Sequence, residues 1–382
     1  MKIVEVRGYH VGFSPNPAIG NSRTWIRRRD FLLVEIVTDN GIRGWGEVFS
    51  SPHAAAALIQ TKLTPLILGQ SPLAYRRLWE TMVATHGYDR RGASMMAVSA
   101  IDMALHDIAA KSLGVSVAAM LGGALRDRIF AYASGPFIAE GTDPYGQYPG
   151  IVDECLKRGY RAFKPRAGVG PRQDGEMANA MRKQVGPDVG LMVDINQGYT
   201  ARAAIDSAHR MADAHLLWIE EPVQPEDITG YATVAAAVPT AIAGGEALAS
   251  LAAFKDMLEA RTFSIVQPDL TVCGGYTGFM RIAALCAAYD LPVMAHAFGT
   301  VVNQRAALQV SSLLPASRGG GPAAYPYIEY DVTPNPLLDL QGPVTIESDG
   351  TVSLPDVPGT GLELDAKNLE PWITKTWSQT YQ

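Results

Sequence analysis

Three acidic residues stand at equal intervals along the chain, and each follows a short apolar run. Asp194 ends LMVD, Glu220 stands in LLWIEEP, and Glu246 follows AIAGG. Both intervals are 26 residues. An acid after a strand can simply cap the next helix, but three acids at one interval favour a shared site.

Three carboxylates in one place repel each other, and a bound cation is the usual remedy. Ligands that are all oxygen, without Cys or His, indicate a hard ion. Mg²⁺ fits best, because it takes few carboxylates and keeps coordination positions for water and substrate. The sequence therefore predicts one Mg²⁺ per subunit, held by Asp194, Glu220 and Glu246.

Further polar groups follow short apolar runs at similar intervals, before and after the three acids. They are Lys164 and Arg166 in YRAFKPRAG, Asp269 in IVQPDL, His296 in PVMAHAF and Glu329 in YPYIEYD. A single His or Asp is more often a structural residue than a catalyst. Asp269 and His296 are 27 residues apart, however, which is close to the same interval. They can therefore hydrogen-bond, and the carboxylate would then orient the imidazole and raise its basicity.

The elements that must position these groups are short runs rich in Val, Ile and Ala, which alternate with helical stretches. The runs end near Ser134, Lys164, Asp194, Glu220, Ala243, Gln267, His296 and Glu329. Eight such units predict a (β/α)8 barrel over 127–330, with the polar groups converging at its mouth. A doubly wound open sheet is the alternative, but no GxGxxG follows an early strand.

The remaining chain predicts an α+β capping domain over 1–126. Residues 1–13 alternate as a strand does, and Asp-Asn-Gly inside 31–49 is a hairpin signal. Residues 93–113 have helical period, which ends at a glycine. The segment 331–382 is rich in Pro and Gly, and we expect it to return to the capping domain.

Composition narrows the class of protein. The 382 residues are 47% hydrophobic and 18% charged, with a net charge of −6, which is typical of a globular chain. Beyond Arg27-Arg28-Arg29 there is no basic cluster, so we expect no nucleic-acid partner. No apolar run approaches the length of a membrane span, and the N-terminus lacks the pattern of a signal peptide. The three cysteines, with no CxxC, indicate reduced thiols in a cytoplasmic protein.

The motifs together are more specific than any one of them. They are GWGEV, the helix SAIDMALHDIAAKSLGVSVAAMLGG, DIN, EEP, GGE, QPDLTVCGGYTG and the strand that ends at His296. With these motifs the chain resembles the enolase superfamily, and within it the mandelate racemase-like subgroup, over nearly its whole length. The resemblance implies Mg²⁺-assisted removal of a proton α to a carboxylate, through an enediolate, with a Lys or His base.

The resemblance also implies roles for individual residues. The metal ligands of the subgroup match Asp194, Glu220 and Glu246, and its His-Asp dyad matches His296 and Asp269. The residue that hydrogen-bonds the enolate, on the side opposite the strand-two lysines, matches Glu329, which we expect to be protonated.

The second strand departs from the subgroup. Its motif is usually Lys-x-Lys, whereas this chain has Lys164-Pro165-Arg166. Arginine is a poor base near neutral pH because its pKa exceeds about 12. We therefore expect a one-base reaction at His296, with Lys164 and Arg166 holding the substrate carboxylate, rather than two-base racemisation.

These features favour a sugar-acid dehydratase that converts an aldonate or aldarate to a 2-keto-3-deoxy acid. A cycloisomerase of a sugar-acid lactone, or a racemase or epimerase of a hydroxy acid, shares the first step. A non-catalytic metal-binding barrel is a more remote alternative, since every position of the site holds a chemically useful group. We expect a small carboxylate as substrate, no membrane partner, and a homo-oligomer between dimer and octamer.

Substrate choice is expected to depend on two loops of the capping domain, 14–29 and 50–53, that close over the barrel mouth. The candidates for contacting the substrate are Trp25, Arg27, His53, His86, Tyr88 and Asn196.

Overall fold

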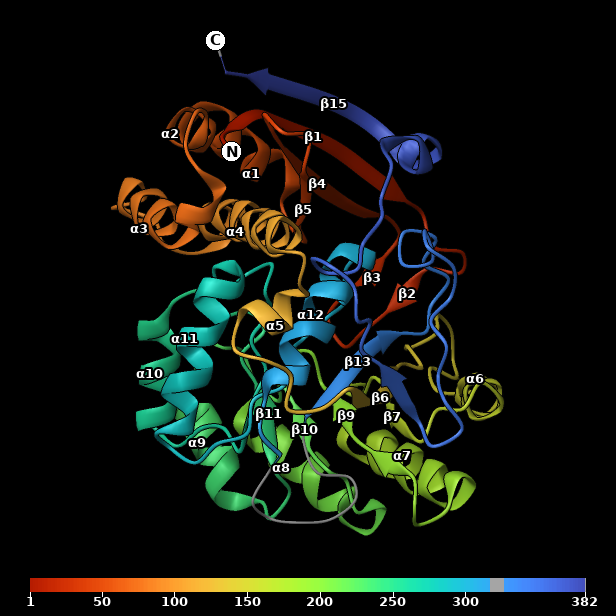
Figure 1. The fold of residues 1–382 in the computed structure, drawn as a ribbon. Helices are drawn as coiled ribbons and strands as arrows, with labels where there is room; N and C mark the ends of the chain where they lie inside the picture. The colour runs from red at the N-terminus through yellow and green to blue at the C-terminus, as the bar shows by residue number, and fades with distance from the viewer. Residues whose placement is uncertain (317–325, 382) are drawn as a thin grey trace.

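The structure is a computed structural model that describes residues 1–316 and 326–381. Figure 1 shows a capping domain above a barrel, with the C-terminal strand lying beside the N-terminal strand. Residues 317–325, which belong to the predicted barrel, and residue 382 lie outside the described residues.

The capping domain is built on an antiparallel sheet with the order β15-β1-β4-β5. Its strands are β1 (Ile3–Phe13), β4 (Arg29–Thr38), β5 (Arg43–Val48) and β15 (Ile373–Thr380). The predicted turn at 39–41 joins β4 to β5, with Gly41 at a φ of 83°. A small hairpin of β2 (Ile19–Gly20) and β3 (Trp25–Ile26) stands in the loop between β1 and β4.

Helices cover one face of this sheet. They are α1 (Pro52–Leu58), α2 (Thr64–Ile67), α3 (Tyr75–Thr85), α4 (Gly92–Leu113) and α5 (Val117–Met120), with a π turn η1 (Ile59–Leu63) and a 3₁₀ turn η2 (Pro72–Ala74). A Cβ at Gly46 would lie 1.8 Å from the carbonyl oxygen of Ala100, so only glycine lets α4 pack this closely on β5. By length and composition α4 could cross a bilayer, but 89% of its most apolar stretch is buried, as in a core helix.

The barrel strands are parallel and short. They are β6 (Arg128–Ser134), β7 (Ala162–Lys164), β8 (Gly190–Leu191), β9 (Val193–Asp194), β10 (Ile219–Glu220), β11 (Ile242–Gly244), β12 (Ile265–Val266) and β13 (Tyr327–Asp331). They form two arcs, β13-β6-β7-β8 and β9-β10-β11-β12. A bridge between Arg166 and Asp194 joins the arcs on one side.

Seven of the eight predicted runs contain assigned strands, since β8 and β9 together make the third. The run that ends at His296 is reduced to two parallel bridges, Val266 to Val293 and Asp269 to His296. It therefore still lies beside the β12 segment, as the predicted order requires.

Helices surround the barrel and separate its strands. They are α6 (Tyr148–Lys157), α7 (Pro171–Val185), α8 (Ala201–Arg210), α9 (Ile228–Ala237), α10 (Leu251–Glu259), α11 (Gly275–Ala287) and α12 (Val301–Leu313), with a 3₁₀ turn η3 (Ala212–Ala214). Each connection is a strand, a mouth-side loop and a helix, so residues just after the strands gather at one rim.

The C-terminal segment belongs to both parts of the molecule. β14 (Thr351–Ser353) adds to the barrel by pairing antiparallel with β6, which the sequence did not indicate. After the 3₁₀ turn η4 (Ala366–Trp372), β15 pairs antiparallel with β1 in the capping sheet. The cysteines at 155, 273 and 286 are free and buried.

Candidate active site

The three acids lie side by side at the ends of adjacent strands. Glu220 on β10 is the register partner of Asp194 on β9. Glu246 follows β11, which pairs with β10 on its other side. Asp194 and Glu220 are buried, whereas the Glu246 side chain is 21% exposed. The equal spacing in the sequence thus becomes a row of carboxylates at the barrel mouth, which we call the carboxylate ladder.

Two cationic side chains of the second strand contact this ladder. The buried Lys164 ammonium forms an ion pair with Glu220 and lies 3.1 Å from Glu329. Burial alone would lower the pKa of Lys164, but these carboxylates outweigh burial and raise it. The Arg166 guanidinium lies 3.3 Å from Asp194. Lys164 and Arg166 are therefore both charged, and both are aimed at the ladder.

Arg166 is held in a fixed orientation by its surroundings. It stacks on the ring of Phe137 at 4.4 Å, with Phe298 on a second side at 5.7 Å. One of its terminal nitrogens donates to the Ser134 hydroxyl at 3.2 Å. A planar, permanently charged group held in this way can bind an anion but is a poor proton acceptor.

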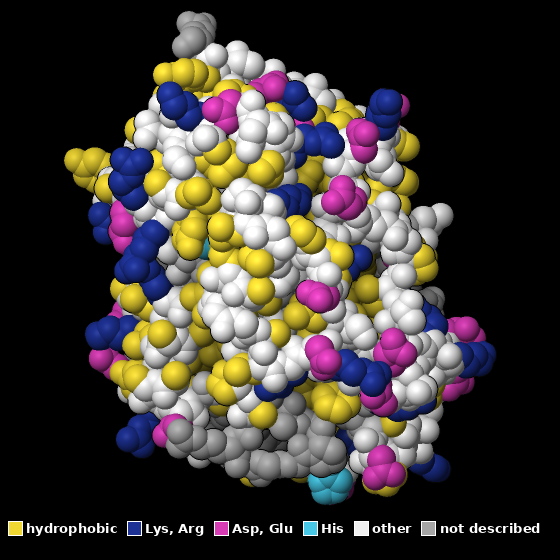
Figure 2. Space-filling model, viewed as in Figure 1, with side chains coloured by type: hydrophobic (Ala, Val, Ile, Leu, Met, Phe, Trp, Pro, Cys, Tyr) yellow, Lys and Arg dark blue, Asp and Glu magenta, His cyan; other side chains and the backbone are white. Residues whose placement is uncertain are grey.

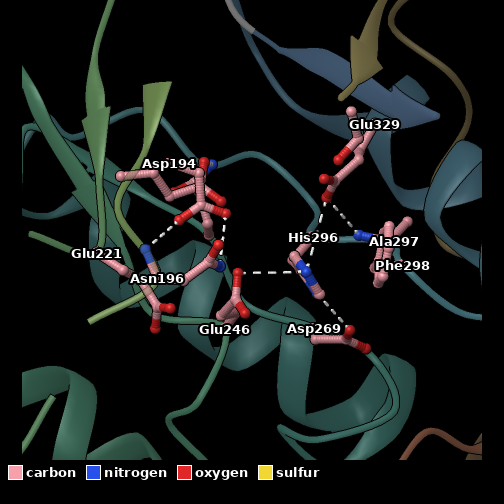
Figure 3. A network of polar contacts seen from close by, with 12 residues as sticks. Asp194, Asn196, Glu221, Glu246, Asp269, His296, Ala297, Phe298 and Glu329 are labelled. Carbon is pink, nitrogen blue, oxygen red and sulfur yellow. Dashed lines mark hydrogen bonds and ion pairs between the residues drawn. The ribbon is translucent and has the colours of Figure 1, made fainter. Parts of the chain in front are cut away.

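The predicted His-Asp pair is present. The His296 Nδ1 atom lies 2.6 Å from the Asp269 carboxylate, as Figure 3 shows. The other oxygen of Asp269 accepts hydrogen bonds from the backbone N–H and the hydroxyl of Thr271, at 2.6 and 2.7 Å. Asp269 is thus fixed on both sides and holds the imidazole through one nitrogen only.

The second ring nitrogen of His296 faces the ladder. Its Nε2 atom lies 3.2 Å from Glu246 and 3.8 Å from Glu329. Burial would lower the pKa of His296, but Glu246, Glu329 and Asp269 together raise it well above its usual value. The imidazole is therefore a strong base that points Nε2 into the space between the ladder and β13 (Figure 3).

Glu329 differs from the expectation. We expected a protonated carboxyl, but the structure places Glu329 beside Lys164, His296 and Arg166. Burial would raise its pKa, and these cations lower it instead, well below the ordinary value. One oxygen also accepts the backbone N–H of Ala297 at 3.1 Å. In this arrangement Glu329 faces positively charged partners, which favour its carboxylate form.

The ladder has the donor chemistry of a Mg²⁺ site. Burial and neighbouring carboxylates raise the pKa of Asp194, and they raise the pKa of Glu246 to about 7. This is the repulsion that a divalent cation relieves. As the side chains lie, no three His, Cys, Asp or Glu groups within the described residues converge on one point, because the ladder oxygens pair with Lys164, Arg166 and His296. The donors fit the ion in kind and in place, and their oxygens would turn from these partners to hold it.

Asn196 is a predicted substrate contact that hydrogen-bonds directly to the ladder. Its backbone N–H and side-chain amide both donate to Asp194, at 2.7 and 2.8 Å. Its side-chain oxygen is buried without a hydrogen-bond partner among the described residues. That oxygen is available to accept a hydrogen bond from a substrate hydroxyl.

The loop 14–29 rests on the barrel rim as expected. The Ser22 hydroxyl donates to the Ile195 carbonyl oxygen at 2.5 Å, and Arg23 donates to Gln197 at 2.9 Å. Trp25 is half-buried in the hairpin, and the exposed Arg27 forms an ion pair with Glu140.

The other predicted substrate contacts lie apart from one another. His53 is exposed and stacks on His10 of β1, with ring centroids 4.6 Å apart. His86 is buried in the capping domain, and Tyr88 is fully exposed. Among the described residues, no hydrogen bond, ion pair or ring contact joins these three to the ladder.

The structure adds residues that sequence reasoning missed. Glu221, the second acid of EEP, is buried beside the ladder at a φ of 42° and accepts a hydrogen bond from Gln197 at 2.9 Å. Gln267 donates to Glu220 at 2.6 Å. Phe49 places its ring 6.2 Å from the His296 ring. Glu221 and Gln267 each stand next to a strand end in the sequence, which was the available signal.

Comparisons with known proteins identify the family of this chain. Residues 4–122 match the family described as mandelate racemase / muconate lactonizing enzyme, N-terminal domain, and residues 150–368 match enolase C-terminal domain-like. The chain is 34% identical to D-galactarolactone cycloisomerase of Agrobacterium fabrum, over 97% of this chain and 98% of that protein. It is 29% identical to arabinonate dehydratase of Saccharolobus solfataricus, over 91% of each.

A solved structure shares the fold and itself holds magnesium. A racemase from Streptomyces coelicolor with bound magnesium superposes with a TM-score of 0.86 at 26% identity, covering 97% of this chain and 100% of that one. The two relatives named above are enzymes: one is a cycloisomerase and the other is a dehydratase. The chain belongs to the mandelate racemase / muconate lactonizing enzyme family of the enolase superfamily, with a capping domain on a (β/α)8 barrel.

Proposed function

We propose that this protein removes the proton α to the carboxylate of a sugar acid and then expels an oxygen leaving group from the β-carbon. The observation that carries the proposal is the His296–Asp269 pair at 2.6 Å, with Nε2 directed toward the carboxylate ladder. A general base needs one ring nitrogen that is fixed and protonated and a second that can accept a proton. Nδ1 meets the first need, and Nε2, which pairs with Glu246 in this structure, meets the second when Glu246 turns away from it.

We assign the ladder, Asp194, Glu220 and Glu246, as the residues that would hold Mg²⁺. When bound, Mg²⁺ withdraws charge from the substrate carboxylate and so acidifies the α-proton. Lys164 and Arg166 bind the same carboxylate and stabilise the charge that develops on it as the proton leaves.

His296 carries the proton through the reaction. Nε2 takes the α-proton, and the electron pair of that C–H bond forms the enediolate. As the enediolate collapses, the C–O bond at the β-carbon breaks, and the imidazolium returns a proton to the departing hydroxyl, which leaves as water. The enol product tautomerises to a 2-keto-3-deoxy acid, so the net reaction is dehydration of an aldonate or aldarate.

A cycloisomerase is the second candidate, favoured by the 34% identity to a galactarolactone cycloisomerase over nearly the whole chain. The same proton abstraction would then expel a ring oxygen instead of water. A racemase needs a second base on the opposite face, and Arg166 does not supply one.

A panel of aldonates, aldarates and their lactones, incubated with Mg²⁺ in D₂O, tests the proposal. Semicarbazide detects the 2-keto acid, and proton NMR follows both α-deuteration and the product. Keto-acid formation from an open-chain acid supports dehydration, and formation only from a lactone supports the cycloisomerase. A non-catalytic barrel would leave every compound unchanged, and this result would refute the proposal. The homo-oligomer remains a prediction that gel filtration with light scattering decides.

A further inference from the structure

The segment that follows the catalytic base is gripped by the capping domain. His296 is followed by Ala297, Phe298 and Gly299, and Thr300 then caps helix α12 by accepting the Val302 N–H on its hydroxyl at 3.2 Å. The segment is buried throughout. Two side chains of the capping sheet, Glu47 and Arg29, hold this backbone.

Glu47, at the end of β5, is the first of these side chains. Its carboxylate accepts the backbone N–H groups of Thr300 and Asn303, each at 3.0 Å, and the Thr300 hydroxyl at 2.6 Å. Glu47 thus binds the free N–H groups at the start of α12, where a carboxylate is most stabilising. It is completely buried, so no solvent competes for these donors.

Gly299 lies in close contact with the Glu47 carboxylate. A Cβ at Gly299 would lie 2.2 Å from a Glu47 oxygen and 3.0 Å from the Asn303 Cβ. The backbone at 299 therefore has to be glycine for the carboxylate to reach the helix end.

Arg29, at the start of β4, grips the same segment from its carbonyl side. It donates to the Phe298 carbonyl oxygen at 2.5 Å and pairs with Asp331 at 2.5 Å. Asn335 in turn donates to the Gly299 carbonyl oxygen at 3.0 Å. The N–H groups and the carbonyl groups of this short segment are thus both fixed from outside it.

The helix end that Glu47 holds also reaches the dyad. Asn303 lies on the first turn of α12, and its side-chain nitrogen is 3.5 Å from both carboxylate oxygens of Asp269. Glu47 therefore touches neither catalytic residue but fixes the backbone that leads to His296 and the side chain that faces Asp269.

We propose that Glu47 is a positioning residue, through which the capping domain sets the geometry of the His296–Asp269 dyad. This inference rests on the proposed role of the dyad in α-proton removal. It assigns the capping domain a part in proton transfer in addition to substrate choice.

Glu47→Gln is the decisive variant, because the amide keeps the size but turns one acceptor into a donor that faces an N–H group. Glu35→Gln is the matched control. Glu35 is also completely buried in the capping sheet, but it binds Arg7, Tyr9 and Arg43 and not the barrel. Both variants are measured as the full chain with Mg²⁺, on a compound that the parent protein converts.

We expect Glu47→Gln to slow α-proton exchange and kcat about 10-fold to 100-fold, as lost support of a catalytic group does, with KM nearly unchanged. Hydrogen–deuterium exchange of the peptide 297–305, followed by mass spectrometry, should be faster in Glu47→Gln and parental in Glu35→Gln. Thr300→Val removes the hydroxyl that donates to Glu47 and that also caps Val302, but it leaves the Glu47 bonds to the backbone N–H groups of Thr300 and Asn303. It should give a smaller loss in the same direction and serves if Glu47→Gln does not fold.

The two measurements separate the possible failures. Unchanged kcat in Glu47→Gln, with or without faster amide exchange, overturns the positioning role. An equal loss of kcat in Glu35→Gln overturns it too, because the effect would then be a general weakening of the capping domain. A parent protein that converts no compound refutes the proposed function. Amide exchange can be measured without any activity, and an unchanged exchange rate of peptide 297–305 in Glu47→Gln would refute the inference that Glu47 holds the start of α12.

Discussion

Replacing Asp269 by Asn should invert the tautomer of His296 and so disable the base without removing it. One Asp269 oxygen accepts two hydrogen bonds from Thr271, from its N–H at 2.6 Å and its hydroxyl at 2.7 Å. The amide oxygen of Asn has to take that position, because an NH₂ group there would face a donor. The NH₂ group then faces His296 Nδ1, which the carboxylate contacts at 2.6 Å in the parent.

The magnitude follows from where the proton goes. An Nδ1 atom that accepts from the NH₂ group carries no proton, so the ring proton moves to Nε2, which can no longer take a proton from the substrate. The same inversion in a serine-protease triad costs about 10⁴-fold in kcat, which corresponds to about 5 kcal/mol of barrier. We expect a loss of this order for Asp269→Asn, approaching that of His296→Asn.

The assay is α-proton exchange in D₂O by NMR, run beside keto-acid formation over a range of pH. Mg²⁺ affinity should persist in both variants, since neither residue belongs to the ladder. Loss of a general base typically slows a reaction by about 10²-fold to 10⁴-fold. A rate of Asp269→Asn within about tenfold of the parent would therefore show that the base still works. The inverted tautomer would then be wrong, and Asp269 would only tune the basicity of the ring.

Three further predictions follow from the same contacts. EDTA should abolish activity and Mg²⁺ should restore it, while Glu220→Gln should lose activity far more than stability; a fully active metal-free enzyme would contradict the ladder assignment. Arg166→Lys should allow the α-proton of the second substrate epimer to exchange with D₂O, and a parent that already exchanges both epimers equally would exclude the one-base mechanism. Burial raises the pKa of Glu47 to about 7, above 4.5 in the unfolded chain. The carboxyl is therefore harder to ionise in the folded chain than in the unfolded chain, so stability that is present below pH 4.5 is lost as the pH rises to 7. Urea unfolding should show that the free energy of unfolding of the parent, compared with that of Glu47→Gln, falls by about 3 kcal/mol between pH 4.5 and pH 7. If the difference between the two free energies stays constant over this range, Glu47 has the ordinary pKa of a glutamate.

The barrel and the row of acids could be predicted because both depend on local order. A constant interval between strand ends places Asp194 opposite Glu220 in register, whatever the loops do. The His296–Asp269 contact follows from the same rule, since parallel neighbours end at one rim. The residues that gather at a barrel mouth can therefore be predicted from the spacing of the strand ends.

Side-chain charge states could not be read in this way. The pKa of Glu329 is set by Lys164 and His296, which lie 165 and 33 residues away along the chain and come close only in the fold. The grip of Glu47 on Thr300 joins positions 253 residues apart. GWGEV could identify a hairpin, but nothing in its local pattern shows that its acid ends on a barrel helix.

The charges at the mouth also constrain the substrate. Asp194, Glu220 and Glu246 have as partners Arg166, Lys164 and His296 respectively, the groups assigned to the substrate carboxylate and its α-proton. Carboxylates that hold Mg²⁺ leave the buried Arg166 and Lys164 in need of another anion, because an unpaired buried cation is costly. A neutral sugar cannot meet that need, whereas a carboxylate can. The same pairing that balances the site in this structure therefore favours a substrate whose acid group enters between the ladder and the second strand.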